Sequence, residues 1–329
     1  MAPDAAIDEG MIERAAEVLR AGGMVAFPTE TVYGLGADAL RDEAVRGVYE
    51  LKGRPRHNPM IVHVADEAMA RGVAAEWPER ASSLAHRFWP GPLTLVLRRS
   101  ASVPDLVTAG HRTVGVRCPD HPIALALIRA FGGPIVGPSA NPSGGVSPTR
   151  AEHVRAGFPG VDLLVLDGGA CRTGIESTVL SLVHDPARIL RPGVVSREEI
   201  GEEVQASIPG AGLDEEPGGA MSSPGRMASH YAPRARVELF DGAQWPGVVA
   251  GAPSESVVIT HNPARVGEPG VRFVRLPEGA VAYAAHLYAA LREADALGSG
   301  LILIERPEGR GGLWTAIHDR LERAAGPRS

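Results

Sequence analysis

Lysine is almost absent from this chain of 329 residues. Lys52 is the only one, and every other member of its 33 Lys and Arg residues is an arginine. A P-loop requires Gly-Lys-Ser/Thr, whereas Lys52 stands between Leu51 and Gly53, which excludes that phosphate site. A kinase-type lysine lies on a strand, whereas Lys52 ends a predicted helix. Nothing beside it indicates Schiff-base chemistry, so the commoner lysine-based sites are excluded.

Cysteine is also scarce. Cys118 and Cys171 are the only two, and they form neither a disulfide framework nor a metal-ligand pattern, so we expect a protein of the reducing cytoplasm. No spacing of His, Cys and carboxylate residues is typical of a protein-bound metal. We therefore expect no metal site built by the chain and no organic cofactor, whereas Mg²⁺ carried by the phosphates of a substrate is compatible with the sequence.

Aromatic residues, net positive charge and long apolar runs are lacking too. Aromatics make up 5% of the chain and the formal net charge is −6. This weighs against broad nucleic-acid binding, which needs a cationic face and stacking platforms. No apolar run is long enough to span a bilayer, and the first residues lack a secretory segment. We expect no membrane partner and no requirement for stable nucleic-acid binding.

Strands alternate with helices along the first two thirds of the chain, which is typical of an α/β sheet. Many short strands and proline-rich loops favour a twisted mixed sheet over a regular doubly wound one. Residues 29–39, small and polar, are expected to form a loop. The pattern predicts helices at 8–20, 42–51, 78–88, 121–131 and 197–205, and strands at 24–27, 60–64, 93–97, 113–117, 135–136, 163–166 and 178–183.

Composition divides the chain into three parts. Residues 1–206 are predicted to form the larger, first domain. Residues 207–235, rich in Gly, Pro, Ser and acidic residues, read as a linker. Residues 236–329 are predicted to form a smaller three-layer α/β domain, with strands at 237–240, 256–260, 271–275 and 301–305 and helices at 280–297 and 313–325.

The stretch 51–63 concentrates basic residues, and by itself it has two interpretations. It is either a solvated cationic turn or a cradle for a polyanion such as a nucleotide triphosphate. Hydroxyl, amide and guanidinium groups also follow several other predicted strands, and these groups recognise phosphates and carboxylates. A site of this kind acts by positioning and charge stabilisation, as phosphoryl and nucleotidyl transfer require.

Two near-motifs fail on inspection. The segment 34–39 fits the dinucleotide-binding fingerprint loosely, but the preceding predicted strand ends at Phe27, well before the first glycine. The segment 137–141 nearly spells a hydrolase nucleophile elbow, but Asn141 replaces its last glycine and Pro138 disturbs the turn. A serine nucleophile is therefore not expected.

Several motifs together resemble the YrdC-type threonylcarbamoyl-AMP synthases in their long, two-domain form, in order and spacing. They are Phe27-Pro-Thr-Glu-Thr-Val-Tyr-Gly-Leu-Gly36, Lys52-Gly-Arg-Pro55, Asn58-Pro-Met-Ile-Val-His63, Trp89-Pro-Gly-Pro-Leu-Thr94, Val116-Arg-Cys-Pro119, Pro138-Ser-Ala-Asn141, Ser177-Thr-Val179 and Leu190-Arg-Pro-Gly193. Ser223-Pro-Gly225 and His230-Tyr-Ala-Pro233 look like that form's linker, and Gly312–Leu321 is the best match in the C-terminal domain.

The resemblance implies that the chain is a nucleotidyltransferase. It would make threonylcarbamoyl-AMP and pyrophosphate from L-threonine, bicarbonate and ATP, for a downstream transferase machinery that modifies the adenosine beside the anticodon of certain tRNAs. Lys52 and Arg54 would be the catalytic groups at the phosphates. Threonine would be held by Thr31, His63, Arg117, Gly137 and Ser177. ATP would be held by Arg54, Asn58, Thr113, Ser139, Ser147, Arg191 and Tyr231.

The resemblance also leaves three points open. The carbamate intermediate is labile in water, so the linker segment 223–233 is a candidate lid. An RNA-binding module is an alternative from another class, against which the acidic charge and few aromatics weigh. A related domain that makes a carbamoyl-adenylate for another acceptor is a third reading, although the modules that usually accompany it are absent.

Overall fold

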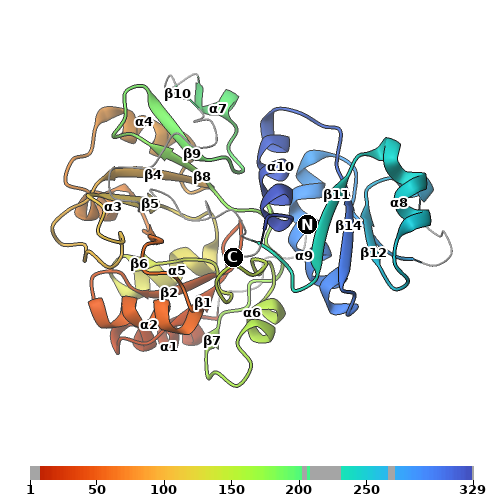
Figure 1. Cartoon of the computed structure of the whole chain (residues 1–329). Coiled ribbons are helices and arrows are strands. Elements are labelled where there is room, and N and C mark those ends of the chain that lie inside the picture. Colours follow the sequence, from red (N-terminus) through yellow and green to blue (C-terminus); the bar gives the residue numbers. More distant parts are fainter. Residues whose placement is uncertain (1–7, 202–205, 208–230, 266–270, 328–329) are drawn as a thin grey trace.

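The computed structural model describes residues 8–201, 206–207, 231–265 and 271–327, and these form two α/β domains side by side (Figure 1). The predicted fold class is confirmed. Among the described residues, a large mixed sheet forms the first domain and a smaller parallel sheet forms the second. No described helix is long and apolar enough to cross a membrane.

Ten described strands form the sheet of the first domain, in the order β10-β9-β8-β4-β5-β3-β6-β2-β1-β7. The sheet is mixed, since β3 runs parallel to β5 but antiparallel to β6. The strands are β1 (Val25–Phe27), β2 (Gly34–Asp38), β3 (Ile61–His63), β4 (Leu93–Arg98), β5 (Thr113–Arg117), β6 (Ile135–Val136), β7 (Leu164–Val165), β8 (Thr178–Ser181), β9 (Ala187–Arg191) and β10 (Ala206–Ser207).

Helices cover this sheet and share apolar clusters with it. Helix α1 begins after the cap residue Asp8, whose side chain accepts a hydrogen bond from Met11 N, and its apolar face packs against α5. The helices are α1 (Glu9–Arg20), α2 (Asp42–Lys52), α3 (Glu67–Val73), α4 (Glu79–Phe88), α5 (Pro122–Phe131), α6 (Ala151–Gly157) and α7 (Arg197–Gly201).

The predicted loop at 29–39 is wrong over its second half, where β2 pairs antiparallel with β1. Its glycines gave no strand signal because a strand is normally recognised by large side chains. The structure needs them small: a Cβ on Gly34 would lie 2.8 Å from Cζ of Phe27. The short helices α3 and α6 and the strands β9 and β10 were not predicted either. The predicted helices and strands of this domain are confirmed within a few residues over their described part.

Four parallel strands form the sheet of the second domain, in the order β11-β14-β12-β13. Alternate residues of β12 face opposite sides: Val257 and Ile259 pack with α9 and α10, whereas Val258 belongs to the cluster beside α8. The elements are β11 (Arg236–Phe240), α8 (Trp245–Gly251), β12 (Val257–Thr260), β13 (Arg272–Arg275), α9 (Ala280–Ala296), β14 (Leu301–Glu305) and α10 (Gly312–Ala324). The predicted elements are confirmed, and α8 is an addition.

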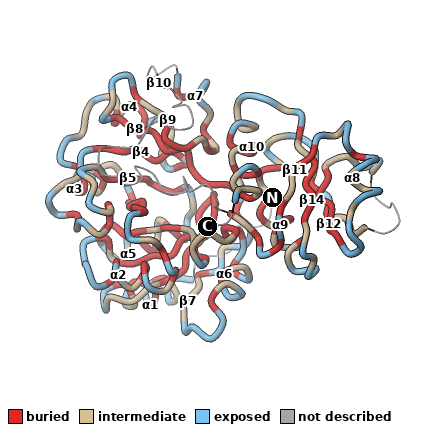
Figure 2. Tube along the Cα trace, viewed as in Figure 1, coloured by how far each residue is buried: buried red, intermediate tan, exposed pale blue. Residues whose placement is uncertain are grey.

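Helices α9 and α10 lie between the two sheets and face the first domain (Figure 1). One apolar cluster continues across the junction, because Val32, Val146 and Ile175 of the first domain belong to the same cluster as Leu287 of α9. Figure 2 shows buried chain on both sides of this junction. The second domain is therefore packed onto the first through its helical face.

The predicted domain limits of 1–206, 207–235 and 236–329 stay predictions. The last described strand before the gap is β10, and β11 opens the second domain. Residues 208–230 lie outside the described residues, as do residues 202–205 of the helix predicted at 197–205. Only Tyr231 to Pro233 of the candidate lid fall in the described part.

Candidate active site

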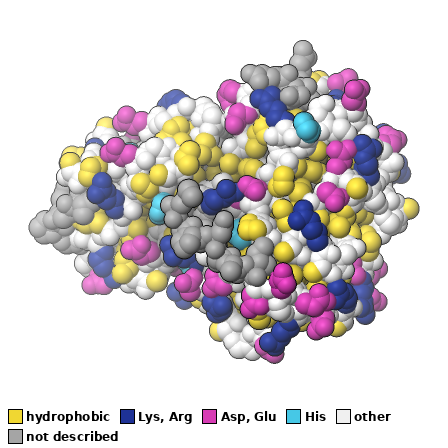
Figure 3. Space-filling view, turned by 180° about the vertical axis from the view of Figure 1, so that it is seen from behind, with side chains coloured by type: hydrophobic (Ala, Val, Ile, Leu, Met, Phe, Trp, Pro, Cys, Tyr) yellow, Lys and Arg dark blue, Asp and Glu magenta, His cyan; other side chains and the backbone are white. Residues whose placement is uncertain are grey.

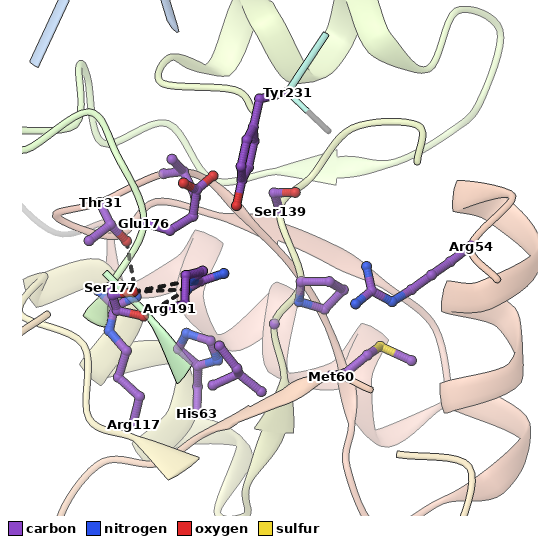
Figure 4. Close-up of a pocket in the computed structure, with 14 residues that line it drawn as sticks. Thr31, Arg54, Met60, His63, Arg117, Ser139, Glu176, Ser177, Arg191 and Tyr231 are labelled. Carbon is purple, nitrogen blue, oxygen red and sulfur yellow. Dashed lines mark hydrogen bonds between the residues drawn. The ribbon is translucent and has the colours of Figure 1, made fainter. Parts of the chain in front are cut away.

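A pocket opens in the first domain beside the junction, with about 510 Å³ of atom-free space including its mouth (Figure 4). The β1–β2 connection, β3, the end of β5, the segment after β6, the start of β8 and the end of β9 all contribute to its wall. Tyr231, which precedes the second domain, completes it. It is lined by Thr31, Val32, Arg54, Met60, Ile61, His63, Arg117, Gly137, Pro138, Ser139, Glu176, Ser177, Arg191 and Tyr231.

Arg117 is the best-fixed cation of the predicted threonine site. Its Nη2 lies 2.7 Å from Oε2 of Glu30, its Nη1 donates to Oγ1 of Thr31 at 3.0 Å, and its Nε donates to Gly91 O. Arg117 and Glu30 are both almost completely buried. A guanidinium held on three sides is preorganised to meet a carboxylate, since little side-chain freedom remains to be lost.

His63 and Ser177 lie near Arg117 in the same wall (Figure 4). Burial, together with the charge of Arg117, lowers the pKa of His63 to about 3, so its imidazole is neutral at neutral pH. Oγ of Ser177 lies 2.9 Å from Oγ1 of Thr94. Arg191 reaches the same residue, because its Nη2 donates to both the carbonyl and the hydroxyl of Ser177. This wall offers a fixed cation beside neutral hydrogen-bonding groups.

Arg54 approaches the pocket from the side of Met60, opposite the Arg117 wall (Figure 4). Its Nη2 donates to Oδ1 of Asn58 at 2.8 Å and to Pro59 O at 2.6 Å, and its Nε donates to Asn58 O. Burial lowers the pKa of Arg54 to about 10, which leaves it charged at neutral pH. Asn58 is itself fully buried and does not line the pocket, so in this structure it orients Arg54.

Lys52 does not line the pocket; it lies behind the pocket wall. Its Nζ donates to the carbonyls of Ser139 and Asn141, each at 2.5 Å. Burial, with the charge of Arg54 nearby, lowers the pKa of Lys52 well below its usual value. The lone lysine therefore holds the segment that carries Ser139 into the pocket. The prediction that it faces the phosphates stays untested.

Thr113 and Ser147, two further residues predicted to bind ATP, also stand outside the pocket lining. Thr113 lines a second, smaller cavity, which shares Met60 and Ile61 with the first. Ser147 is fully buried and donates from Oγ to Oε1 of Glu176 at 2.7 Å. The nine other predicted residues line the pocket together: Thr31, Arg54, His63, Arg117, Gly137, Ser139, Ser177, Arg191 and Tyr231.

Two buried carboxylates, Glu30 and Glu176, were given no role among the predicted site residues. Glu30 stands inside the motif 27–36 and Glu176 directly precedes the motif 177–179. Each comes just before a predicted substrate-binding residue, and this position was the available signal. Burial alone would raise the pKa of Glu176, but the charges of Arg320 and Arg191 outweigh it and lower that pKa to about 2. Each carboxylate balances the charge of a pocket arginine.

The described residues hold no group of three or more His, Cys, Asp or Glu side chains that could bind a metal ion. The pocket lining offers three arginines, neutral donors and one carboxylate, Glu176. The arginines of such a lining suit an anionic substrate.

Fold and site together define a two-domain α/β protein with a buried, arginine-rich pocket beside the domain junction. Residues 17–193 match the Sua5/YciO/YrdC family model, described as "Telomere recombination", and residues 195–326 match the model "Threonylcarbamoyl-AMP synthase, C-terminal domain". The threonylcarbamoyl-AMP synthase of Pyrococcus abyssi is 42% identical over 98% of this chain and 96% of its own length. That of Bacillus subtilis is 46% identical over 72% of this chain and 68% of its own length.

Solved structures agree with the sequence comparisons. The crystal structure of P. abyssi Sua5 complexed with L-threonine has a TM-score of 0.89 at 40% identity and covers 98% of this chain and 96% of its own. That of Escherichia coli YciO has a TM-score of 0.51 at 25% identity and covers 57% of this chain and 91% of its own. The chain belongs to the threonylcarbamoyl-AMP synthase family in its two-domain form, which confirms the resemblance drawn from the motifs.

Proposed function

We propose that this chain is an L-threonylcarbamoyladenylate synthase, which makes threonylcarbamoyl-AMP and pyrophosphate from L-threonine, bicarbonate and ATP. The observation that carries the proposal is the pocket wall around Arg117, in a chain that matches a threonine-complexed relative along its length. The product would then serve the threonylcarbamoyl modification of tRNA by a downstream transferase machinery.

The proposed chemistry has two steps. The amino nitrogen of threonine attacks the carbon of bicarbonate and water leaves, which gives a carbamate. An oxygen of the carbamate then attacks the α-phosphorus of ATP, the bond from that phosphorus to the bridging oxygen breaks, and pyrophosphate leaves. No protein nucleophile takes part, so the chain acts by positioning its substrates and stabilising charge.

The pocket residues suit separate roles in these steps. Arg117 would bind the carboxylate of threonine, with Thr31 and Ser177 beside it as neutral partners. His63, with a pKa of about 3, is a poor proton acceptor at neutral pH and would serve as a hydrogen-bonding group. Arg54 would lie toward the phosphates, and Mg²⁺ would be carried by those phosphates rather than by protein ligands.

Pyrophosphate release from ATP tests this proposal. We expect release to require both L-threonine and bicarbonate, and the adenylate to appear in equal amount. Release without threonine would refute the assignment. Leucine in place of threonine is the matched control.

An RNA-binding function receives no support from the described part of the face shown in Figure 3. On the face shown in Figure 3, the described arginines are interspersed with Asp and Glu side chains instead of gathering in one basic patch. Phosphate-backbone binding depends on such a patch. Filter binding of tRNA at moderate salt would separate the two functions.

A further inference from the structure

A buried polar cluster joins the second domain to the pocket. Glu176 of the first domain accepts two hydrogen bonds on Oε2 from the second domain: one from Nε of Arg320 at 2.9 Å and one from the hydroxyl of Tyr288 at 2.8 Å. Its other oxygen accepts the hydrogen bond from Ser147. Arg320 belongs to α10 and Tyr288 to α9, and both side chains are fully buried.

The same two residues contact Tyr231 of the pocket wall. The guanidinium of Arg320 lies over the ring of Tyr231, 5.2 Å from its centroid, and the ring of Tyr288 stacks on it at 5.5 Å. Tyr231 has a positive φ of 62°, a conformation that costs free energy for a residue with a side chain and needs surrounding contacts to hold it. Both of these contacts with the ring come from the second domain.

A further residue of the second domain reaches the segment that carries Ser147. Arg292 of α9 donates from Nη2 to Val146 O and from Nε to Ser147 O. Ser147 is thus held at its carbonyl by Arg292 and at its hydroxyl by Glu176. One of these partners belongs to the second domain, and the other, Glu176, is itself hydrogen-bonded by that domain.

The apolar cluster at the junction already attaches the second domain, and a buried ion pair is weak evidence for stability, since its desolvation cost offsets its attraction. The carboxylate of Glu176, which is hydrogen-bonded on both oxygens and lines the pocket, can instead hold neighbouring side chains in position. We propose that Arg320 and Tyr288 of the second domain are positioning residues of the nucleotide site, which fix Glu176 and thereby set the positions of Ser147 and Tyr231. This inference rests on the proposed function.

Variants of the full chain test the inference by two readouts, the KM for ATP in pyrophosphate release and the Kd for α,β-methylene-ATP by calorimetry. Arg320→Gln is expected to raise both at least tenfold, with a smaller change in the KM for threonine. Tyr288→Phe, which loses one hydroxyl and keeps its ring, is expected to raise both about threefold. Arg320→Lys retains the charge and is expected to recover part of the loss.

The chain supplies two matched controls. Tyr283 lies on the same helix as Tyr288 and is equally buried, but its hydroxyl has no hydrogen-bond partner among the described residues, so Tyr283→Phe should bind nucleotide as the wild type does. Ile317 lies on α10 in the apolar cluster, so Ile317→Ala loosens the second domain without touching Glu176. It should lower thermal stability and leave the KM for ATP unchanged.

The outcomes separate the two proposals. Wild-type-like nucleotide binding by Arg320→Gln and Tyr288→Phe would overturn the positioning role, as would an equal rise of KM in Ile317→Ala. If Arg320→Gln does not fold, the pair Tyr288→Phe and Tyr283→Phe decides alone. A wild-type chain without threonine-dependent pyrophosphate release would refute the proposed function, whereas binding of α,β-methylene-ATP would still test the positioning residues.

Discussion

Replacing Lys52 by methionine separates two roles of the only lysine. Its Nζ makes two hydrogen bonds to backbone carbonyls, and hydrogen bonds that involve a charged group contribute about 1.5–3 kcal/mol each. Burial lowers the pKa of Lys52, which favours the low end of that range. Lys52→Met should therefore lower the free energy of unfolding by about 3 kcal/mol. For a domain of this size that is a fall in Tm of roughly 6–12 °C.

Thermal unfolding of the full chain, followed by circular dichroism, measures this change. Arg46→Met is the matched control, because Arg46 lies on the same helix with an exposed side chain. Lys52→Met should also lower the affinity for nucleotide, since Ser139 of the pocket lining loses the donor that holds its carbonyl. A Tm within about 2 °C of the wild type would refute the bracing role reasoned from these contacts. Retained pyrophosphate turnover would refute the role at the phosphates.

Three further predictions concern the pocket and the junction. A Cβ on Gly137 would lie 2.5 Å from Nδ1 of His63, so Gly137→Ala should weaken threonine binding at least tenfold by calorimetry, and unchanged affinity would contradict this. Gly174 has φ +73°, and a Cβ there would lie 2.4 Å from Ala284 O of α9. Gly174→Ala should push the domains apart and raise the radius of gyration in X-ray scattering. A radius of gyration equal to that of the wild type would contradict this clash. The pKa of Glu176 is lowered from 4.5 to about 2, so its carboxylate stabilises the fold by about 3 kcal/mol above pH 4.5, a contribution lost as the pH falls toward 2. In urea unfolding at several pH values, Glu176→Gln should lack this part of the acid dependence, and an unaltered dependence would refute the assignment.

Local pattern predicted most of the fold because each element carries its own signal. The apolar faces of α1, α2 and α5 recur at helical spacing, and β4 and β5 are short apolar runs. The signal failed where packing demanded small residues. Strand β2 reads Gly-Leu-Gly-Ala-Asp, and its glycines are required by the ring of Phe27, which lies on another strand.

The motifs predicted most of the pocket as well. Nine of the residues assigned by resemblance line one cavity. Lys52 and Asn58 lie behind the residues that line this cavity. The motifs did not predict this, because a motif reports which residues occur together and not which of them line the cavity. Lys52 holds the carbonyl of Ser139 and Asn58 holds Arg54, so both position residues that line the cavity.

The sequence by itself determined the class of fold, the family, and the absence of the common lysine motifs, because these depend on local pattern and residue identity. Only the tertiary structure decided the partners of the buried charges. Glu176 and Arg320 are 144 positions apart and belong to different domains, yet share one hydrogen bond. The physical reason is that a buried charge requires a partner but does not specify where along the chain it comes from. Packing α9 and α10 against the first domain brings Tyr288 and Arg320 to the pocket wall.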